Sequence, residues 1–267
     1  MQIVAEDSKS AHIGYELRPR TITVESVIPL ADQMVRIRFG GDDLRDLPTA
    51  SAKDHVKLLF DWHADGTPKL PAPGTGIQGL AVRDYTIREL NRVEPHLDID
   101  FVLHDHGIAG RWAQTAKRGN QLGCLGPRGS MVVKDVFDWY VFAADETSLP
   151  ALGRWVGELR PDTSAHAYIE VDNADAEITL RSAADLTVTW LHRNGAAVGT
   201  TTMLADAVRG HELPNLDGYV WAAGEAGSIK PIRGYLADEA GLDRANWDVD
   251  GYWRLNVTNF DHHADED

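Results

Sequence analysis

Hydrophobic and polar residues alternate with a period of two through much of the first half of the chain. Side chains of a strand point alternately to its two faces, so this alternation gives each strand one apolar and one polar face. It predicts antiparallel strands over residues 21–27, 34–39, 54–61, 83–90 and 97–103. Two short apolar runs within residues 121–133 indicate a tight turn of a barrel. About six short strands with one small helix predict a closed antiparallel barrel.

The pattern changes after Lys134. Residues 139–144 form a continuous apolar run, which is typical of a parallel strand buried on both faces. A helix then opens near Pro150, with Thr147 or Ser148 as its cap. Strands and helices continue to alternate, with strands at 165–171, 186–191 and 219–223 and helices at about 200–209 and 228–240. This order predicts a doubly wound α/β domain.

These patterns divide the chain into four parts. We expect an irregular N-terminal arm, a six-stranded antiparallel β-barrel domain, a doubly wound α/β domain and an acidic C-terminal tail, at residues 1–19, 20–135, 136–256 and 257–267. Residues 63–79 are rich in proline and glycine and are expected to lack regular structure.

Composition narrows the classes of function. The formal net charge is −15, from 41 acidic and 26 basic side chains, and this field repels a phosphate backbone. We therefore expect no nucleic-acid partner. The single cysteine, Cys124, rules out a disulfide framework and a four-cysteine iron–sulfur cluster, and it suits a reducing compartment. No secretory signal and no run of 18 apolar residues is present, so we expect a cytoplasmic protein without a membrane span.

The stretch Arg83-Asp84-Tyr85-Thr86-Ile87-Arg88 carries candidate chemistry. A flavin needs an aromatic face for its ring, a polar group near N5 and a cation near its phosphates. Tyr85 offers the first, Thr86 the second and Arg83 the third. The alternative is an edge strand with a surface tyrosine and two solvated arginines.

Residues 104–113 predict a glycine-rich turn that runs into a short helix. Backbone N–H groups at such a helix start bind anions, and a pyrophosphate fits this description. A plain strand-to-helix turn is the alternative. His104 and His106 could also be taken as metal ligands. We expect no metal site, because two residues on one strand face give two ligands at most and no cysteine or clustered histidine completes the set.

An ordered series of motifs covers residues 20–254. It comprises Arg83–Arg88, Asp100–His104, Ala109–Ala113, Gly126–Gly129, Asp145–Ala151, Ala223–Ala226 and Gly251–Arg254. The series resembles the successive motifs of the siderophore-interacting protein family. This resemblance implies an FAD-dependent ferric-siderophore reductase that takes hydride from NADPH or NADH and releases Fe(II), in cytoplasmic iron acquisition. It also implies that the barrel binds FAD and that the α/β domain binds NAD(P)H.

The resemblance assigns site residues as well. The FAD residues are expected to be Arg83, Tyr85, Thr86, Arg88, Val102, His104, Ala109, Gly110, Arg111, Trp112, Ala113, Trp253 and Phe260. The α/β domain binds nucleotide at its strand ends, where Asp145, Glu146, Thr147, Gly224 and Glu225 lie. The chain lacks a G-x-G-x-x-G fingerprint in this domain, so its preference between NADH and NADPH is not readable. It departs from the family in two places: Leu255-Asn256 follows Arg254 where the family usually has a glycine two residues on, and an extra acidic tail runs from Asp261 to Asp267.

A cationic dock would separate a ferric-siderophore reductase from other reductases of the same fold. Ferric catecholate and citrate siderophores are anionic, and the candidate cations are Lys57, Arg128 and Arg254. Lys53 competes with Lys57, and each cation has the alternative of a surface ion pair of little energetic value. Two other functions stay open, a generic flavin or ferredoxin-type reductase and a non-catalytic siderophore-binding module. The siderophore and the electron donor are open too, and we expect a monomer.

Overall fold

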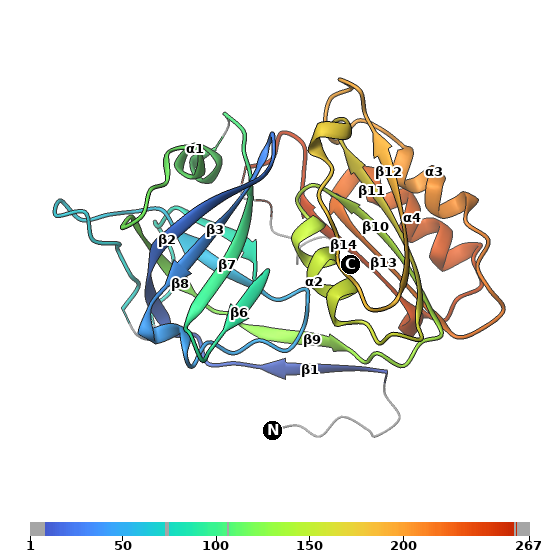
Figure 1. Ribbon diagram of the computed structural model, residues 1–267, viewed down its shortest axis with the longest axis horizontal. Coiled ribbons are helices and arrows are strands. Elements are labelled where there is room, and N and C mark those ends of the chain that lie inside the picture. The colour runs from blue at the N-terminus through green and yellow to red at the C-terminus, as the bar shows by residue number, and fades with distance from the viewer. Residues whose placement is uncertain (1–8, 73–74, 106, 259, 261–267) are drawn as a thin grey trace. The chain divides into compact units, whose positions relative to one another are not determined.

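The computed structural model describes residues 9–72, 75–105, 107–258 and 260. Within this part of the chain there are two compact units (Figure 1). The first contains Ala11–Val133, and the second contains the described residues from Lys134 onward together with Lys9 and Ser10.

The first unit is built on an antiparallel sheet that has seven strands among the described residues. Their spatial order is β5 (Val82–Thr86), β4 (His55–Leu59), β8 (Gln121–Leu125), β2 (Pro19–Ala31), β3 (Met34–Gly40), β7 (His96–Val102) and β6 (Glu89–Asn91). Only Ile87 and Arg88 separate the edge strands β5 and β6 in sequence, so the sheet curls back on itself. The Arg88 N–H donates to the carbonyl of Asp98 at this seam, 3.0 Å away.

The predicted barrel fold is confirmed, with one difference in strand number. The sequence predicted one strand over 83–90, whereas the structure divides it into β5 and β6. The break follows from the seam, because the chain must turn at Ile87 to pair first with β4 and then with β7.

A second difference concerns the N-terminal arm. Residues Ser10–Gly14 form β1, which pairs with β9 (Gly129–Val133) in a separate two-stranded sheet. The Tyr15 hydroxyl lies 2.8 Å from Oγ of Ser130. The arm is therefore not irregular throughout, and β9 pairs with β1 instead of extending the barrel. Backbone pairing forms β1 without a buried apolar face, so its sequence carried no periodic signal.

Two forked ion pairs join β3 and β7. Arg36 donates to both carboxylate oxygens of Asp100 at 2.6 and 2.8 Å. Arg38 does the same to Asp98 at 2.8 and 2.7 Å. Both carboxylates are buried beneath their guanidinium groups, whereas the alternate residues of these strands face the apolar core of the barrel. We call these four residues the arginine–aspartate ladder.

The second unit is a parallel sheet, with five strands in the part that the structure describes. Their order is β12 (Asp185–His192), β11 (Ser164–Val171), β10 (Trp139–Asp145), β13 (Gly218–Glu225) and β14 (Trp247–Trp253). The order reverses between β10 and β13, which makes this the topological switch point of a doubly wound sheet. The predicted α/β domain is confirmed. Strand β14 was not predicted, although Trp247 and Val249 alternate with polar residues along it.

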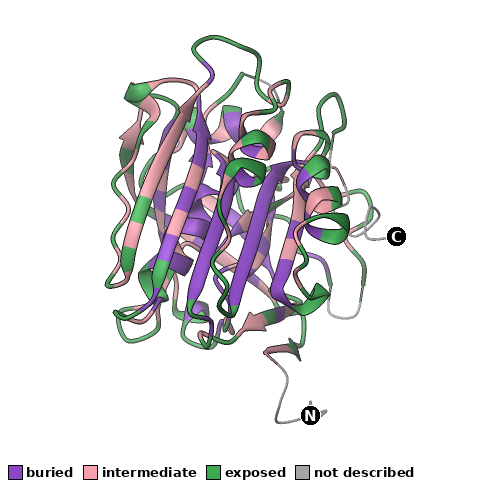
Figure 2. Ribbon diagram, turned by 90° about the vertical axis from the view of Figure 1, so that its right-hand side faces the viewer, coloured by how far each residue is buried: buried purple, intermediate pink, exposed green. Residues whose placement is uncertain are grey.

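Helices cover both faces of this sheet. On one face Val141 packs with residues of α3 (Met203–Gly210) and α4 (Ala226–Asp238). On the other, Trp155 of α2 (Leu149–Glu158) contacts Phe142, with ring centroids 5.5 Å apart. Strands β10 and β13 are consequently buried along their whole length (Figure 2), which explains the continuous apolar run in the sequence.

The remaining helical elements are short. Helix α1 (Ile108–Thr115) belongs to the first unit, and there are 3₁₀ turns at η1 (Asp42–Leu44), η2 (Ala174–Ala176) and η3 (Arg244–Asn246). Among the described residues, none of the helices has the length and apolar character needed to cross a membrane.

Candidate functional site

Strand β5 presents Arg83 and Tyr85 on the same side as the core residues of β4. The strand register sets Tyr85 opposite Val56 and Arg83 opposite Leu58, both of which are fully buried. The Tyr85 ring lies 4.3 Å from the ring of Phe101 between centroids. Burial raises the pKa of the Tyr85 hydroxyl, which keeps it neutral. Tyr85 is thus an uncharged aromatic surface anchored on the barrel core.

The next residues of this stretch have other partners. Thr86 is buried opposite His55 of β4. Arg88 approaches the ladder, with Nε 3.9 Å from Oδ2 of Asp100. Burial, and after it the nearby charge of Arg36, lower the pKa of Arg88. Arg88 therefore already faces a carboxylate within the barrel.

Helix α1 begins at a glycine. Gly107 is the N-cap residue, with φ of 73°, and it has no side chain to accept from the first-turn N–H groups. A Cβ on Gly110 would lie 2.7 Å from the carbonyl oxygen of His104. Gly110 therefore allows the helix to approach the chain that leaves β7 at Val102, and the N-cap residue Gly107 gives the first-turn N–H groups no side-chain cap.

The side chains of α1 divide into two groups. Ala109 and Ala113 are buried in the barrel core, and Trp112 stacks near Phe39 with centroids 6.3 Å apart. Arg111 is exposed. A hollow of about 410 Å³ lies beside Trp112, lined also by Trp62 and by polar residues of 65–67, 115 and 119–121. The core-facing residues therefore hold the helix in place against the barrel.

The candidate dock residues lie in different surroundings. Nζ of Lys57 donates to both carboxylate oxygens of Asp84 on the neighbouring strand, at 2.8 and 2.9 Å. Arg128 is exposed in the first unit, and Arg254 is exposed in the second. Their convergence on one substrate stays a prediction.

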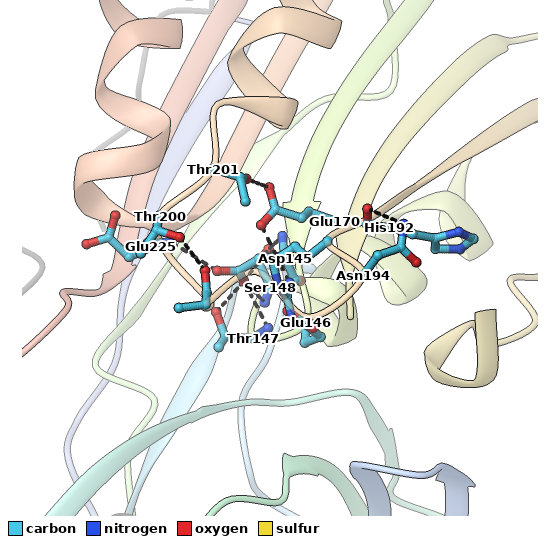
Figure 3. A network of polar contacts seen from close by, with 12 residues as sticks. Asp145, Glu146, Thr147, Ser148, Glu170, His192, Asn194, Thr200, Thr201 and Glu225 are labelled. Carbon is cyan, nitrogen blue, oxygen red and sulfur yellow. Dashed lines mark hydrogen bonds and ion pairs between the residues drawn. The ribbon is translucent and has the colours of Figure 1, made fainter. Parts of the chain in front are cut away.

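In the second unit, Asp145 at the end of β10 is the centre of a polar network (Figure 3). Its carboxylate is buried, and Oδ1 accepts from N and Oγ1 of Thr147 at 2.9 and 2.6 Å and from N of Ser148 at 3.2 Å. Oδ2 accepts from N of Glu225 at 3.0 Å and from Nε1 of Trp253 at 2.8 Å. One carboxylate therefore joins the ends of β10, β13 and β14.

Gly224 and Glu225 complete this junction. A Cβ on Gly224, whose φ is 152°, would lie 2.6 Å from Oδ2 of Asp145. Glu225 caps α4, because its Oε2 accepts from N of Ser228 at 2.7 Å, and its Oε1 accepts from N of Leu255 at 3.1 Å. The sequence predicted nucleotide contacts for Asp145, Glu146, Thr147, Gly224 and Glu225. In the structure Thr147 and the N–H of Glu225 donate hydrogen bonds to Asp145, and Gly224 lies close to the same carboxylate.

A second set of charges lies beside this junction and includes a residue that sequence reasoning missed. Arg193 follows β12 directly, and its side chain contacts Glu146 after β10 and Glu170 in β11. Burial works against the Arg193 charge, but the neighbouring carboxylates outweigh it and raise the pKa of Arg193. Arg193 and Glu146 each directly follow a strand, and this position in the sequence could have indicated that both lie at the nucleotide edge of the sheet.

The predicted C-terminal aromatic residues also lie in the second unit. Trp253 is held by Asp145, and the ring of Phe260 lies 3.3 Å from the position that a Cβ of Gly251 would take. His106 and residues 261–267, with His262 and His263, lie outside the described residues.

Comparison with known families accounts for both units. Residues 23–131 match the model of the siderophore-interacting FAD-binding domain, and residues 137–256 match that of the siderophore-interacting protein. The chain belongs to the siderophore-interacting protein family. The resemblance inferred from the motifs is confirmed, and so is the expectation of an FAD-binding domain.

Several similar proteins extend along almost the same length. The NADPH-dependent ferric-chelate reductase of Escherichia coli is 30% identical over 89% of this chain and 94% of its own. The ferric vibriobactin reductase ViuB of Vibrio cholerae is 27% identical over 84% of this chain and 85% of its own. A siderophore utilization protein from T. fusca has a crystal structure that superposes with a TM-score of 0.88, at 41% identity, over 95% of this chain and 99% of its own.

The first unit of this siderophore-interacting protein suits FAD on structural grounds. Gly107 at the α1 N-cap offers no side chain to the first-turn N–H groups, an arrangement that suits binding of a pyrophosphate. Tyr85 supplies a neutral aromatic face. The residues present therefore fit the cofactor.

Proposed function

We propose that this protein is an NAD(P)H-dependent, FAD-containing reductase of ferric siderophores that acts in iron acquisition. One observation carries the proposal, namely that a family FAD-binding domain and a family α/β domain follow each other in one chain. Two relatives of similar length are named as ferric-chelate and ferric vibriobactin reductases. FAD, when bound, supplies the chemistry, since it accepts hydride and passes electrons singly to Fe(III).

The first unit supplies the flavin contacts. We assign Tyr85 to the ring, Thr86 to its polar edge and Arg83 to the phosphates. The N–H groups that open α1 bind the pyrophosphate, with Gly110 and Trp112 holding the helix against the barrel. His104 and Val102 lead into this helix start. The protein thus orients a cofactor, and no side chain serves as a nucleophile or metal ligand.

The cationic dock determines which class of substrate the protein reduces. Lys57, Arg128 and Arg254 attract an anionic ferric chelate, and each contact is charge-assisted. Since Lys57 already pairs with Asp84, the chelate competes with that carboxylate for the ammonium group. The Lys57–Asp84 ion pair also favours the alternative of a generic flavin reductase, because such an enzyme needs no unpaired cation beside its flavin.

The decisive experiment follows the two half-reactions separately under anaerobic conditions. The FAD-loaded protein is reduced by NADH or NADPH, and the reduced protein is then mixed with ferric catecholate and ferric citrate chelates. We expect both steps, and we expect Arg128→Ala to raise the apparent Michaelis constant for the chelate about tenfold, as the loss of one charge-assisted contact requires. Arg118→Ala removes another exposed arginine from the same unit and is the matched control.

The outcomes separate the three functions. Flavin reduction without reoxidation by any ferric chelate would indicate the generic reductase. Chelate binding to a protein whose flavin neither nucleotide reduces would indicate a non-catalytic module. Equal chelate kinetics in the Arg128 variant and its control would remove Arg128 from the dock.

A further inference from the structure

The carboxyl ends of the parallel strands β10 to β13 are poor in basic side chains, whereas Arg254 directly follows the remaining strand, β14. The segments 145–148, 170–174, 192–202 and 223–228 end or directly follow β10, β11, β12 and β13. Their sequences contain one arginine, Arg193, and no lysine. Nucleotides bind across this edge in doubly wound folds. The net charge of the side chains at this edge therefore affects whether a nucleotide with a 2′-phosphate binds there.

The two terminal nitrogens of Arg193 face two carboxylates. Its Nη2 donates to Oε1 of Glu146 at 2.5 Å and its Nη1 donates to Oε2 of the same group at 3.1 Å. Nη1 also lies 3.5 Å from Oε1 of Glu170, whose Oε2 accepts from Thr201. The side chains of Arg193 and Glu170 are each 5% exposed. One positive charge thus faces two negative charges, and the group is anionic as a whole.

Asp172 adds to this excess. It directly follows β11, the second strand of the domain, and an acidic residue at this position accepts a hydrogen bond from the adenosine ribose 2′-hydroxyl in NAD-binding folds. Asp172 is among the carboxylates that stabilise the Arg193 charge. A 2′-phosphate here would bring close to two further negative charges toward three carboxylates.

We propose that this protein takes NADH in preference to NADPH, because Glu146 and Glu170 occupy the one arginine of the segments that end β10 to β13 and Asp172 opposes a 2′-phosphate. The inference rests on the proposed function, in which the nucleotide binds at these strand ends. A phosphate that paired with Arg193 would leave the mostly buried carboxylate of Glu146 without its partner, and this loss costs binding free energy. The chain thereby differs from the Escherichia coli relative, whose name specifies NADPH.

The wild-type protein gives the first test. Its FAD-loaded form is reduced anaerobically by NADH or NADPH over a range of concentrations. We expect the second-order constant to be at least about tenfold higher for NADH, a ratio that corresponds to one strong charge contact. A second readout needs no turnover: calorimetry should show ADP binding more tightly than adenosine 2′,5′-bisphosphate.

Two matched variants test the residues. Glu146→Gln removes one carboxylate from Arg193 and should move the NADPH/NADH ratio about tenfold toward NADPH. Glu158→Gln makes the same charge change on α2, where the side chain is 55% exposed and pairs with Arg154. It should leave the ratio unchanged.

Each result has a defined consequence. Equal constants, or a preference for NADPH, would overturn the inference and leave the proposed function intact. Failure of both nucleotides to reduce the flavin, in a protein that still reduces ferric chelates after dithionite treatment, would overturn the nucleotide part of the proposed function and the inference with it. If Glu146→Gln does not fold, the wild-type constants and the calorimetry decide.

Discussion

Replacing Asp145 by asparagine tests how strongly one carboxylate holds the switch point of the α/β unit. The amide can keep its oxygen toward Thr147 and Ser148. Its NH₂ group then faces the N–H of Glu225 and the indole N–H of Trp253, which are 3.0 and 2.8 Å from the present oxygen. If the amide rotates by half a turn, its oxygen accepts from Glu225 and Trp253, and its NH₂ group then faces the N–H groups of Thr147 and Ser148. Either way, at least two buried donors face another donor.

The expected loss follows from these contacts. A hydrogen bond to a charged acceptor contributes roughly 1.5–3 kcal/mol, and the neutral amide costs less to bury than a carboxylate. We therefore expect a loss of about 3 kcal/mol in the free energy of unfolding, taking the lower end for two bonds. With a urea dependence of about 2 kcal/mol per molar, the midpoint falls by about 1.5 M. Urea unfolding followed by tryptophan fluorescence measures this shift.

The matched control is a second aspartate-to-asparagine substitution in the same sheet. Asp185→Asn makes the same chemical change at an exposed position of β12 in the same sheet, and it should shift the midpoint hardly at all. If Asp145→Asn and Asp185→Asn have the same midpoint, the Asp145 carboxylate does not hold the strand ends together as argued.

The remaining predictions concern the flavin helix and pH. Gly110→Ala should lower bound FAD per protein, measured by absorbance, because the added Cβ would lie 2.7 Å from the His104 carbonyl; full occupancy would contradict this. Burial lowers the pKa of His166 and of His211, which lies 2.8 Å from the Tyr168 hydroxyl. The unfolded chain then binds more protons below about pH 6.5, so urea midpoints should fall as pH drops from 7 to 5.5. His211→Gln should flatten that slope; an unchanged slope would exclude His211.

Much of the fold could be predicted because burial imposes a period on the sequence. The strand β3 has one apolar face and β10 has two, and each pattern was legible. Strands β1 and β6 were not predicted as separate elements, since backbone pairing forms them and a half-exposed strand of three to five residues has too few positions to show a period. Strand β14 also alternates, with Trp247 and Val249 buried, but only these two of its residues are buried, so its apolar face is brief.

The candidate site was predictable only to the level of strand ends. Position in sequence indicated that Asp145 and Glu225 end their strands, yet it gave no information on the direction of their carboxylates. In the structure both oxygens of each group accept backbone N–H donors. The ion pair of Glu146 with Arg193 joins residues 47 positions apart. It depends on how β10, β11 and β12 pack side by side, and no local sequence motif indicates it.

The arginine–aspartate ladder has a consequence for how the barrel finds its correct strand alignment during folding. The apolar faces of β3 and β7 would still meet if one strand slid by two residues along the other, because both repeat with a period of two. Such a slide would pair Arg36 with Asp98, or Arg38 with Asp100, and leave one arginine and one nearly buried aspartate without a partner. Only the native alignment satisfies both forks. The ladder therefore selects among alignments that hydrophobic burial alone does not distinguish. One of its strands, β7, pairs with β6, which follows the Tyr85 strand β5 in sequence.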